Sequence, residues 1–233
     1  MIARDMAWLR RETLRYMGMG NVDEDHADPR ILRGAEEALT ELSQRTRPRF
    51  LHKIFSLDFL AEAEDTLSFG NVLNVKSRSL RKNLQDCREA VFFAATLGTE
   101  ADQMISRASR RDISLGLTME AAATALIEEY CDQCQMEIEE EMNRQDLTLR
   151  PRFSPGYGDF DIAFQKSMLQ VLDTPRRIGV SLTEGGMLAP SKSVTAIMGI
   201  ASWKEKNTGK RQRCHIHGCE ACHKTDCLYR RNK

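Results

Sequence analysis

The sequence is poor in aromatic residues, carries no net charge and contains no long apolar run. Aromatic residues make up 6% of its 233 positions and hydrophobic residues 41%, so the core must consist mainly of aliphatic side chains and methionine. Because 34 basic residues balance 34 acidic ones, no overall field favours nucleic acid. The longest apolar run, 90–95, is far shorter than the roughly 20 residues of a membrane-spanning helix.

The N-terminus lacks the apolar core of a secretory signal peptide. Charged residues occupy Arg4 and Asp5, where such a core would begin. We therefore expect a cytoplasmic protein without membrane or nucleic-acid partners. In that compartment its seven cysteines should be thiols or metal ligands rather than disulfides.

The apolar patterns predict an α+β fold. Helical spacing or capping residues predict helices over 1–20, 29–45, 118–144 and 162–172, with short ones after Ser77 or Ser79 and after Thr99. Alternating or continuous apolar residues predict strands over 47–55, 67–69, 72–75, 90–98, 177–182 and 193–200. The order lacks regular β-α-β alternation, so we expect an antiparallel or mixed central sheet flanked by helices.

The segment from Arg152 to Tyr157 combines groups that suit a small ligand. Arg152 offers bidentate recognition of a carboxylate, Gly156 permits close backbone approach, and Tyr157 presents an aromatic face and a hydroxyl. The same residues also make an ordinary turn, because Ser-Pro-Gly-Tyr-Gly is favourable turn chemistry. The companion segments therefore decide its interpretation.

Those companions are Thr183-Glu184, followed by Pro190, Ser193 and Val194, together with the upstream run 90–98 and Ala125–Glu128. In this order the segments resemble the activation domain of cobalamin-dependent methionine synthase, and in particular its stand-alone members. The resemblance covers about 1–200 and is closest from 75 onward. One departure is Gly185, which stands where the family has a serine hydroxyl.

The resemblance implies a site for S-adenosylmethionine. Matched by position, its contacts are Arg152, Ser154, Gly156 and Tyr157 of the loop, and the helical carboxylate Glu128, with Glu129 as the adjacent alternative. Arg152 would hold the ligand carboxylate, Glu128 the ammonium or ribose, and Tyr157 the adenosine end. Thr183, Glu184 and Ser193 would line or support the site. Taken alone, Glu128 is also an ordinary surface glutamate.

The resemblance also implies a function. The chain would bind S-adenosylmethionine and support reductive methylation of oxidised cob(II)alamin, which a methionine synthase or related corrinoid protein supplies. A flavodoxin- or ferredoxin-type donor would provide the electron. The chain has no Asp-x-His-x-x-Gly cobalamin signature and no Gly-x-Gly-x-x-Gly loop opening a helix, so the cobalamin must belong to the partner. The protein would be an activating component rather than a stand-alone catalyst.

The C-terminal segment is basic and rich in cysteine. Between 203 and 233 nine Lys or Arg oppose three Asp or Glu, and the thiols are Cys214, Cys219, Cys222 and Cys227. Four thiols at this density suit zinc or an iron–sulfur cluster, although the spacing matches neither a zinc ribbon nor a standard ferredoxin. A reduced tail and a redox dithiol remain alternatives.

The remaining cysteines and the organisation of the chain complete the interpretation. Cys131 and Cys134 share a helix face, which permits a metal or dithiol site, but buried cysteine is the commoner case and is expected for Cys87 too.

We divide the chain into a helical and hairpin part (1–75), the ligand-binding core of the same domain (76–203) and the tail (204–233). Two rival functions are a metal-binding redox or interaction module acting through the tail, and a corrinoid-independent small-molecule methyltransferase.

Overall fold

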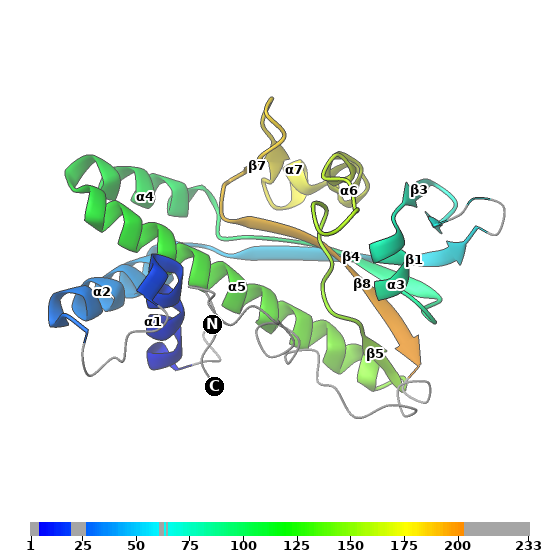
Figure 1. The fold of residues 1–233 in the computed structure, drawn as a ribbon, viewed down its shortest axis with the longest axis horizontal. Helices are drawn as coiled ribbons and strands as arrows, with labels where there is room; N and C mark the ends of the chain where they lie inside the picture. The colour runs from blue at the N-terminus through cyan, green and yellow to red at the C-terminus, as the bar shows by residue number, and fades with distance from the viewer. Residues whose placement is uncertain (1–4, 20–26, 61–62, 64, 203–233) are drawn as a thin grey trace.

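The protein is built around one six-stranded antiparallel sheet, which confirms the α+β prediction. The computed structural model describes residues 5–19, 27–60, 63 and 65–202 (Figure 1). The strand order is β3-β2-β1-β4-β8-β5, and every neighbouring pair is antiparallel. The strands are β1 (Arg49–Phe59), β2 (Thr66–Phe69), β3 (Leu73–Lys76), β4 (Glu89–Thr96), β5 (Leu147–Leu149) and β8 (Ser193–Ser202).

Strand β4 lies in the centre of the sheet and is buried on both faces. All side chains from Ala90 to Ala95 have no exposed surface, as the uninterrupted apolar run predicts. Alternate residues point to opposite sides, so Phe93 joins one hydrophobic core and Phe92 the other. The sheet therefore separates two cores that position different groups of helices.

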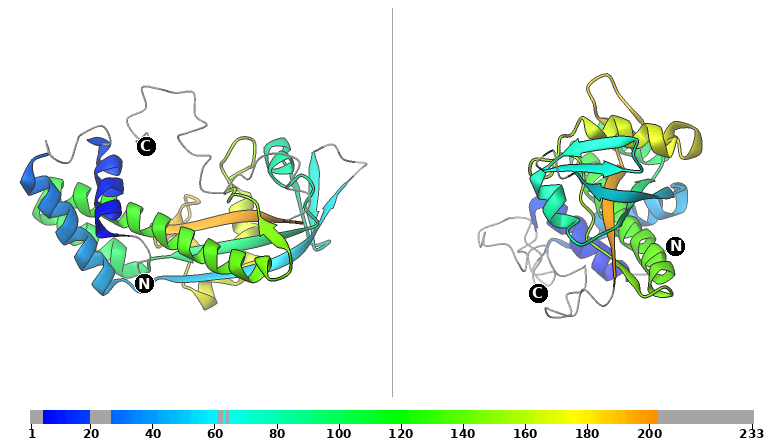
Figure 2. Two further views of the ribbon diagram at one scale, coloured as in Figure 1. Left: turned by 90° about the horizontal axis from the view of Figure 1, so that it is seen from below. Right: turned by 90° about the vertical axis from the view of Figure 1, so that its right-hand side faces the viewer.

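The first face carries the N-terminal helices and the long helix. They are α1 (Met6–Leu14), which leads into the π-helical turn η1 (Arg15–Met19), α2 (Pro29–Arg45), α4 (Thr99–Arg111) and α5 (Ile113–Asn143). Ala121, Ala122, Ala123 and Ala125 of α5 are buried. Their small side chains permit close packing of α5 with α2, α4 and the sheet, and Figures 1 and 2 show α5 running along this face.

The second face carries shorter elements. They are α3 (Arg78–Asn83), α6 (Phe164–Leu172), α7 (Thr174–Arg177) and the separate hairpin of β6 (Ser181–Leu182) and β7 (Leu188–Ala189). Leu80, Met168 and Leu172 pack there against Phe92 and Ile197 of the sheet. Loops and hairpin turns occupy much of this side, which is typical of a face that forms binding sites.

Several predicted boundaries were wrong. Helix α5 begins at Ile113 rather than Thr118, because the carboxylate of Asp112 accepts the backbone N–H of Leu115 and caps the helix there. The strand predicted over 177–182 is reduced to two residues. Pro175 favours the helical turn α7, which extends to Arg177, the first residue of the predicted strand. Gly179 has a φ of 72°, which interrupts an extended chain. The short strand β5 was missed.

Other predictions hold. Ser77 rather than Ser79 caps α3, with its hydroxyl accepting the N–H of Leu80 at 3.1 Å. Cys87, Cys131 and Cys134 are buried free thiols, as expected of core cysteines. Within the part of the chain that the structure describes, none of the helices has the length and apolar character to cross a membrane.

Candidate functional site

A row of polar side chains runs along helix α5 on its half-buried side. Glu120, Thr124, Glu128 and Asp132 follow each other at intervals of four residues, so they lie one above the other along about 18 Å of the helix. We call these four residues the α5 polar row. A cation contacts each end of the row: Lys192 at Glu120 and Thr124, and Arg152 at Glu128 and Asp132.

Arg152 is held tightly against α5. Its Nη2 donates to Oδ1 of Asp132 at 2.7 Å, and its Nη1 donates to Oε1 of Gln135 at 2.9 Å. The carboxylate of Glu128 lies 3.7 Å from the same Nη2. The side chain of Arg152 is 18% exposed and that of Glu128 is 40% exposed. The structure thus brings together the two charged residues that the sequence predicted, and Glu128 keeps access to solvent.

The neighbouring residue Glu129 occupies a different environment. Glu129 is 1% exposed and its Oε1 accepts a hydrogen bond from the side chain of Gln133 at 2.8 Å. A buried carboxylate that already serves a structural hydrogen bond cannot meet a ligand without rearrangement. Of the two glutamates, only Glu128 presents its side chain to solvent.

The loop after Arg152 is attached to the open side of strand β8. Phe153 and Ile197 exchange two backbone hydrogen bonds of 2.9 Å. The chain then turns at Gly156, whose φ of 94° is strained for other residues, and the N–H of Gly156 donates to the carbonyl of Phe160 at 2.7 Å. Tyr157 is 58% exposed, with its ring edge-on to Phe153. Because its N–H is already bonded, Gly156 contributes conformation rather than a backbone donor.

Asp159 anchors this loop to helix α3. Its carboxylate accepts the hydroxyl of Ser77 at 2.7 Å and the backbone N–H groups of Arg78 and Ser79 at 2.8 and 2.9 Å. These hydrogen bonds, that of Ser77 above all, lower the pKa of Asp159 below its ordinary value. The charged carboxylate therefore fixes the loop that presents Tyr157.

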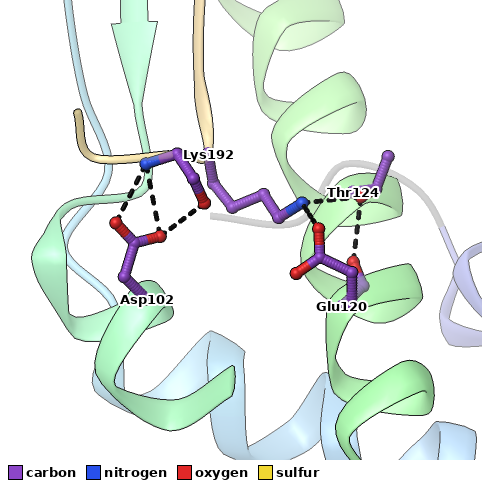
Figure 3. Close-up of polar contacts among 5 residues, drawn as sticks. Asp102, Glu120, Thr124 and Lys192 are labelled. Carbon is purple, nitrogen blue, oxygen red and sulfur yellow. Dashed lines mark hydrogen bonds and ion pairs between the residues drawn. The ribbon is translucent and has the colours of Figure 1, made fainter. Parts of the chain in front are cut away.

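A second polar cluster fixes the segment before β8 (Figure 3). The carboxylate of Asp102 on α4 accepts both the backbone N–H and the hydroxyl of Ser191, at 2.9 and 2.6 Å. Lys192 is buried and points the other way, where its ammonium pairs with Glu120 and donates to the hydroxyl of Thr124 at 3.1 Å. The first contact connects this segment to α4, and the second connects it to the start of the α5 polar row.

The electrostatic character of this region is mildly acidic. The polar row contributes three carboxylates, which face the two cations Lys192 and Arg152. Tyr16 of η1 lies close by, and burial together with the charge of Glu128 raises the pKa of its phenol. Burial lowers the pKa of Arg152, but Cys131 and Asp132 outweigh that effect and raise it, so the guanidinium stays charged. Burial also raises the pKa of Cys134 to about 12, which makes it a poor nucleophile.

The other predicted contacts lie in a separate part of the fold. Thr183 and Glu184 are exposed at the tip of the β6–β7 hairpin, which packs with the core on the face opposite α5. Ser193 is half-buried; its hydroxyl donates to the carbonyl of Pro190 at 2.7 Å and lies at hydrogen-bond distance, 2.8 Å, from the hydroxyl of Thr96. The structure does not join Thr183 or Glu184 to Glu128 and Arg152, and it gives Ser193 a supporting place at the start of β8.

The predicted metal ligands Cys214, Cys219, Cys222 and Cys227 lie outside the described residues. Among residues 5–19, 27–60, 63 and 65–202 no group of three or more potential ligand side chains could hold a metal ion. Cys131 and Cys134 are buried in the core of the first face, and zinc or iron–sulfur binding by the tail stays a prediction.

Sequence reasoning missed four residues of this region: Asp132, Gln135, Asp159 and Lys192. The first two could have been found, because Asp132 is one helical turn beyond Glu128 and Gln135 is three residues further on. Asp159 and Lys192 gave no such signal. Their partners Ser77 and Glu120 are 82 and 72 residues away in the sequence, and only the strand order brings them together.

The fold and the site define a class: an α+β domain with an antiparallel sheet, in which a polar row on a long helix and a Pro-Gly-Tyr loop lie near strand β8. No protein-family model matches the sequence, and no curated protein matches it. Among solved structures the chain is similar to the crystal structure of the MetH reactivation domain bound to AdoHcy, with a TM-score of 0.62 and 16% sequence identity. The match covers 91% of this chain and 79% of that chain. This likeness shows a shared fold.

Proposed function

We propose that this protein binds S-adenosylmethionine beside the α5 polar row and serves as an activating component for a cobalamin-dependent methionine synthase. The observation that carries the proposal is the contact between Glu128 and Arg152, which joins an exposed carboxylate to a fixed cation in a domain of the reactivation fold. The bound AdoHcy of the similar structure supports a ligand of the same class. AdoHcy is S-adenosylmethionine without its sulfonium methyl group.

The charges of the region suit this ligand. S-adenosylmethionine carries a sulfonium, an ammonium and a carboxylate, and therefore a net positive charge. In our proposal Glu128 attracts the ammonium or the ribose hydroxyls, and its charge favours the nearby sulfonium. Arg152 has five N–H donors, of which the bonds to Asp132 and Gln135 use two. The others can hold the ligand carboxylate while Asp132 and Gln135 keep the guanidinium in place.

The loop supplies the remaining contacts. Tyr157 offers an exposed aromatic face to the adenosine end, and Ser154 and Gly156 shape the turn that presents it. Ser193, Thr183 and Glu184 support the site or complete it when a partner is bound. We further propose that 76–203 form the ligand-binding core, that 1–75 complete the same domain, and that 204–233 are a basic tail whose cysteines bind zinc or an iron–sulfur cluster.

The partner in this proposal carries the cobalamin. Two exposed apolar side chains, Tyr157 and Ile162, with 58% and 54% of their surface exposed, flank the loop and offer a contact surface for a cobalamin-binding methionine synthase or a related corrinoid protein. A flavodoxin- or ferredoxin-type donor would reduce the oxidised cobalt by one electron. The methyl group then passes from sulfur to the reduced cobalt, leaving methylcobalamin and S-adenosylhomocysteine.

This chain contributes positioning rather than acid–base chemistry in the proposed reaction. The residues that surround the ligand must hold the sulfonium methyl in line with a cobalt that approaches from the partner. The α5 polar row is suited to that task because salt bridges and hydrogen bonds fix both of its ends.

A charge-neutral variant of Glu128 tests the proposal. We expect Glu128→Gln to weaken S-adenosylmethionine binding roughly tenfold (about 1.4 kcal/mol), because the lost carboxylate faces a cationic ligand. S-adenosylhomocysteine keeps the ammonium and the ribose but lacks the sulfonium charge, so its loss should be smaller, about threefold. Isothermal titration calorimetry of the wild-type and variant proteins with both ligands measures the difference.

The matched control is Glu140→Gln, which removes an exposed carboxylate further along the same helix and should change neither affinity. If wild-type protein shows no saturable S-adenosylmethionine binding, even with a cobalamin-loaded methionine synthase added, the proposed function is wrong. Equal losses for both ligands in Glu128→Gln would instead show that Glu128 does not sense the sulfonium.

A further inference from the structure

A cavity lies beside helix α3, on the face of the sheet opposite helix α5. It has a volume of about 750 Å³ and is lined by Phe59 of β1, by Arg78, Arg81 and Lys82 of α3, and by Asp65 and Asp86 at its rim. We call it the α3 cavity. Figure 1 shows α3 at the end of the molecule opposite α4, whereas the α5 polar row belongs to the other face. Its volume is ample for a small molecule of nucleotide size.

The three cations of the α3 cavity share one side of the helix. Arg81 and Lys82 follow Arg78 by three and four residues, which is the spacing of neighbours on a helical surface. Like charges at this spacing repel each other. A concentration of positive charge on a six-residue helix therefore favours an anion in the space that the three side chains surround.

Arg81 has the most constrained position of the three. Its guanidinium carbon lies 5.0 Å from the ring centroid of Phe59, so the aromatic face fixes its plane. Its Nη1 is buried and has no hydrogen-bond partner within the described part of the chain. A buried charged donor without an acceptor is costly, and a bound anion would satisfy it.

The two carboxylates that line the α3 cavity restrict which anions it can bind. Asp65 and Asp86 line the same space and would repel a bare dianion, but they can accept hydrogen bonds from ligand hydroxyl groups. Guanidinium groups are especially suited to bind phosphoryl oxygens. We propose that the α3 cavity binds a small phosphorylated compound that carries hydroxyl groups, such as a sugar phosphate or a nucleotide.

This site is independent of the proposed S-adenosylmethionine site. Most of its residues belong to α3, β1 and the turn around Asp86, and none of them belongs to the α5 polar row. Failure of one proposal therefore leaves the other intact, provided that the probes differ. Ribose 5-phosphate and pyrophosphate serve as probes because neither contains the adenosine of S-adenosylmethionine.

The experiment is a calorimetric titration of the full chain with ribose 5-phosphate, pyrophosphate and ATP, and with ribose as the unphosphorylated control. ATP is titrated with saturating S-adenosylmethionine present, so that its adenosine cannot occupy the other site. We expect saturable binding of ribose 5-phosphate and ATP and none of ribose. Arg81→Gln and Lys82→Ala should each raise Kd at least about tenfold.

Two controls keep the outcome decisive. Arg33→Ala removes an exposed arginine from α2 and should leave Kd unchanged. Lys82 is exposed, so its truncation cannot disturb the core and separates loss of binding from loss of folding. The proposal is overturned if no phosphorylated probe binds saturably at millimolar concentrations, or if binding persists unchanged in both Arg81→Gln and Lys82→Ala.

Discussion

At the scale of single residues, the polar groups of this protein are arranged in fixed pairs. Arg152 is bonded to Asp132 and Gln135, Lys192 to Thr124, and Asp159 to Ser77. Side chains that are already held in place lose little conformational entropy when a ligand binds. Their contacts with the ligand therefore contribute to affinity with little entropic cost. The same bonds make these residues important for stability, which has to be measured together with binding.

Asp159 shows how such a bond depends on pH. Its folded pKa is lower than that of the unfolded chain, so its charged form stabilises the fold above about pH 4. That contribution is lost as the pH falls below this value towards the lower folded pKa. We therefore expect Asp159→Asn to lower the thermal midpoint at pH 7, with a smaller difference from wild type at pH 2 to 3. Thermal unfolding followed by circular dichroism across pH 2–7 measures this, and a pH-independent difference would contradict it.

At the scale of elements, strand β8 and helix α5 form the framework of the site. β8 pairs with β4 along its length, while its other side receives β5 and then Phe153. Helix α5 runs alongside and presents the polar row to the residues that flank this edge. One close approach makes this arrangement possible: a Cβ at Gly199 would lie 2.5 Å from the sulfur of Cys87 and 2.9 Å from Cδ2 of Leu84.

This close approach leads to a stability prediction. Gly199→Ala should destabilise the protein by about 1–3 kcal/mol, because the new methyl group overpacks the core against α3 and the turn that follows it. Cys87→Ala removes the nearest atom, so the double variant should recover at least about 1 kcal/mol relative to the sum of the single changes. Urea denaturation of the four proteins measures the coupling.

A second glycine provides the control. At Gly34 in α2 an added Cβ would meet no atom within 4 Å, so Gly34→Ala should stabilise the protein by about 0.5–1 kcal/mol through helix propensity alone. If Gly199→Ala proved as harmless as Gly34→Ala, the packing of β8 against Cys87 would differ from the one described.

At the scale of the whole molecule, the described residues form a sheet with a hydrophobic core on each face. Both cores are built from residues before Ser202, the last residue of β8. The basic segment that follows carries the predicted metal ligands and is the working part in the rival interpretation as a metal-binding module. Removing it therefore separates the two functions.

A chain that ends at residue 203 should keep its thermal midpoint within a few degrees and its affinity for S-adenosylmethionine within about twofold. The physical reason is that residues before 203 supply the described parts of both cores and the described contacts of Arg152. Calorimetry with S-adenosylmethionine and thermal unfolding of both chains provide the comparison. Loss of binding together with retained stability would move the function to the cysteine-rich segment.

Much of the architecture could be predicted from local pattern. The buried strand at 90–95, the amphipathic helices and the mixture of strands and helices follow from the period of apolar residues, since each element must bury one face. The ends of helices and strands were harder to predict where a capping residue or a glycine overrides the spacing of apolar residues. Asp112 starts α5 five residues early, and Gly179 interrupts the segment 177–182, so that only its last two residues form a strand.

The sequence by itself determined most of the elements, the mainly aliphatic character of the core, and the Arg-x-x-Pro-Gly-Tyr loop and helical glutamate as candidate site residues. Only the tertiary structure decided which charges meet. Glu128 contacts Arg152, Lys192 pairs with Glu120, and Asp159 reaches Ser77, because the strand order places β8 beside β4 and α5 across its edge. The physical reason is that local propensity depends on near neighbours, whereas a binding site depends on side chains that chain topology brings together.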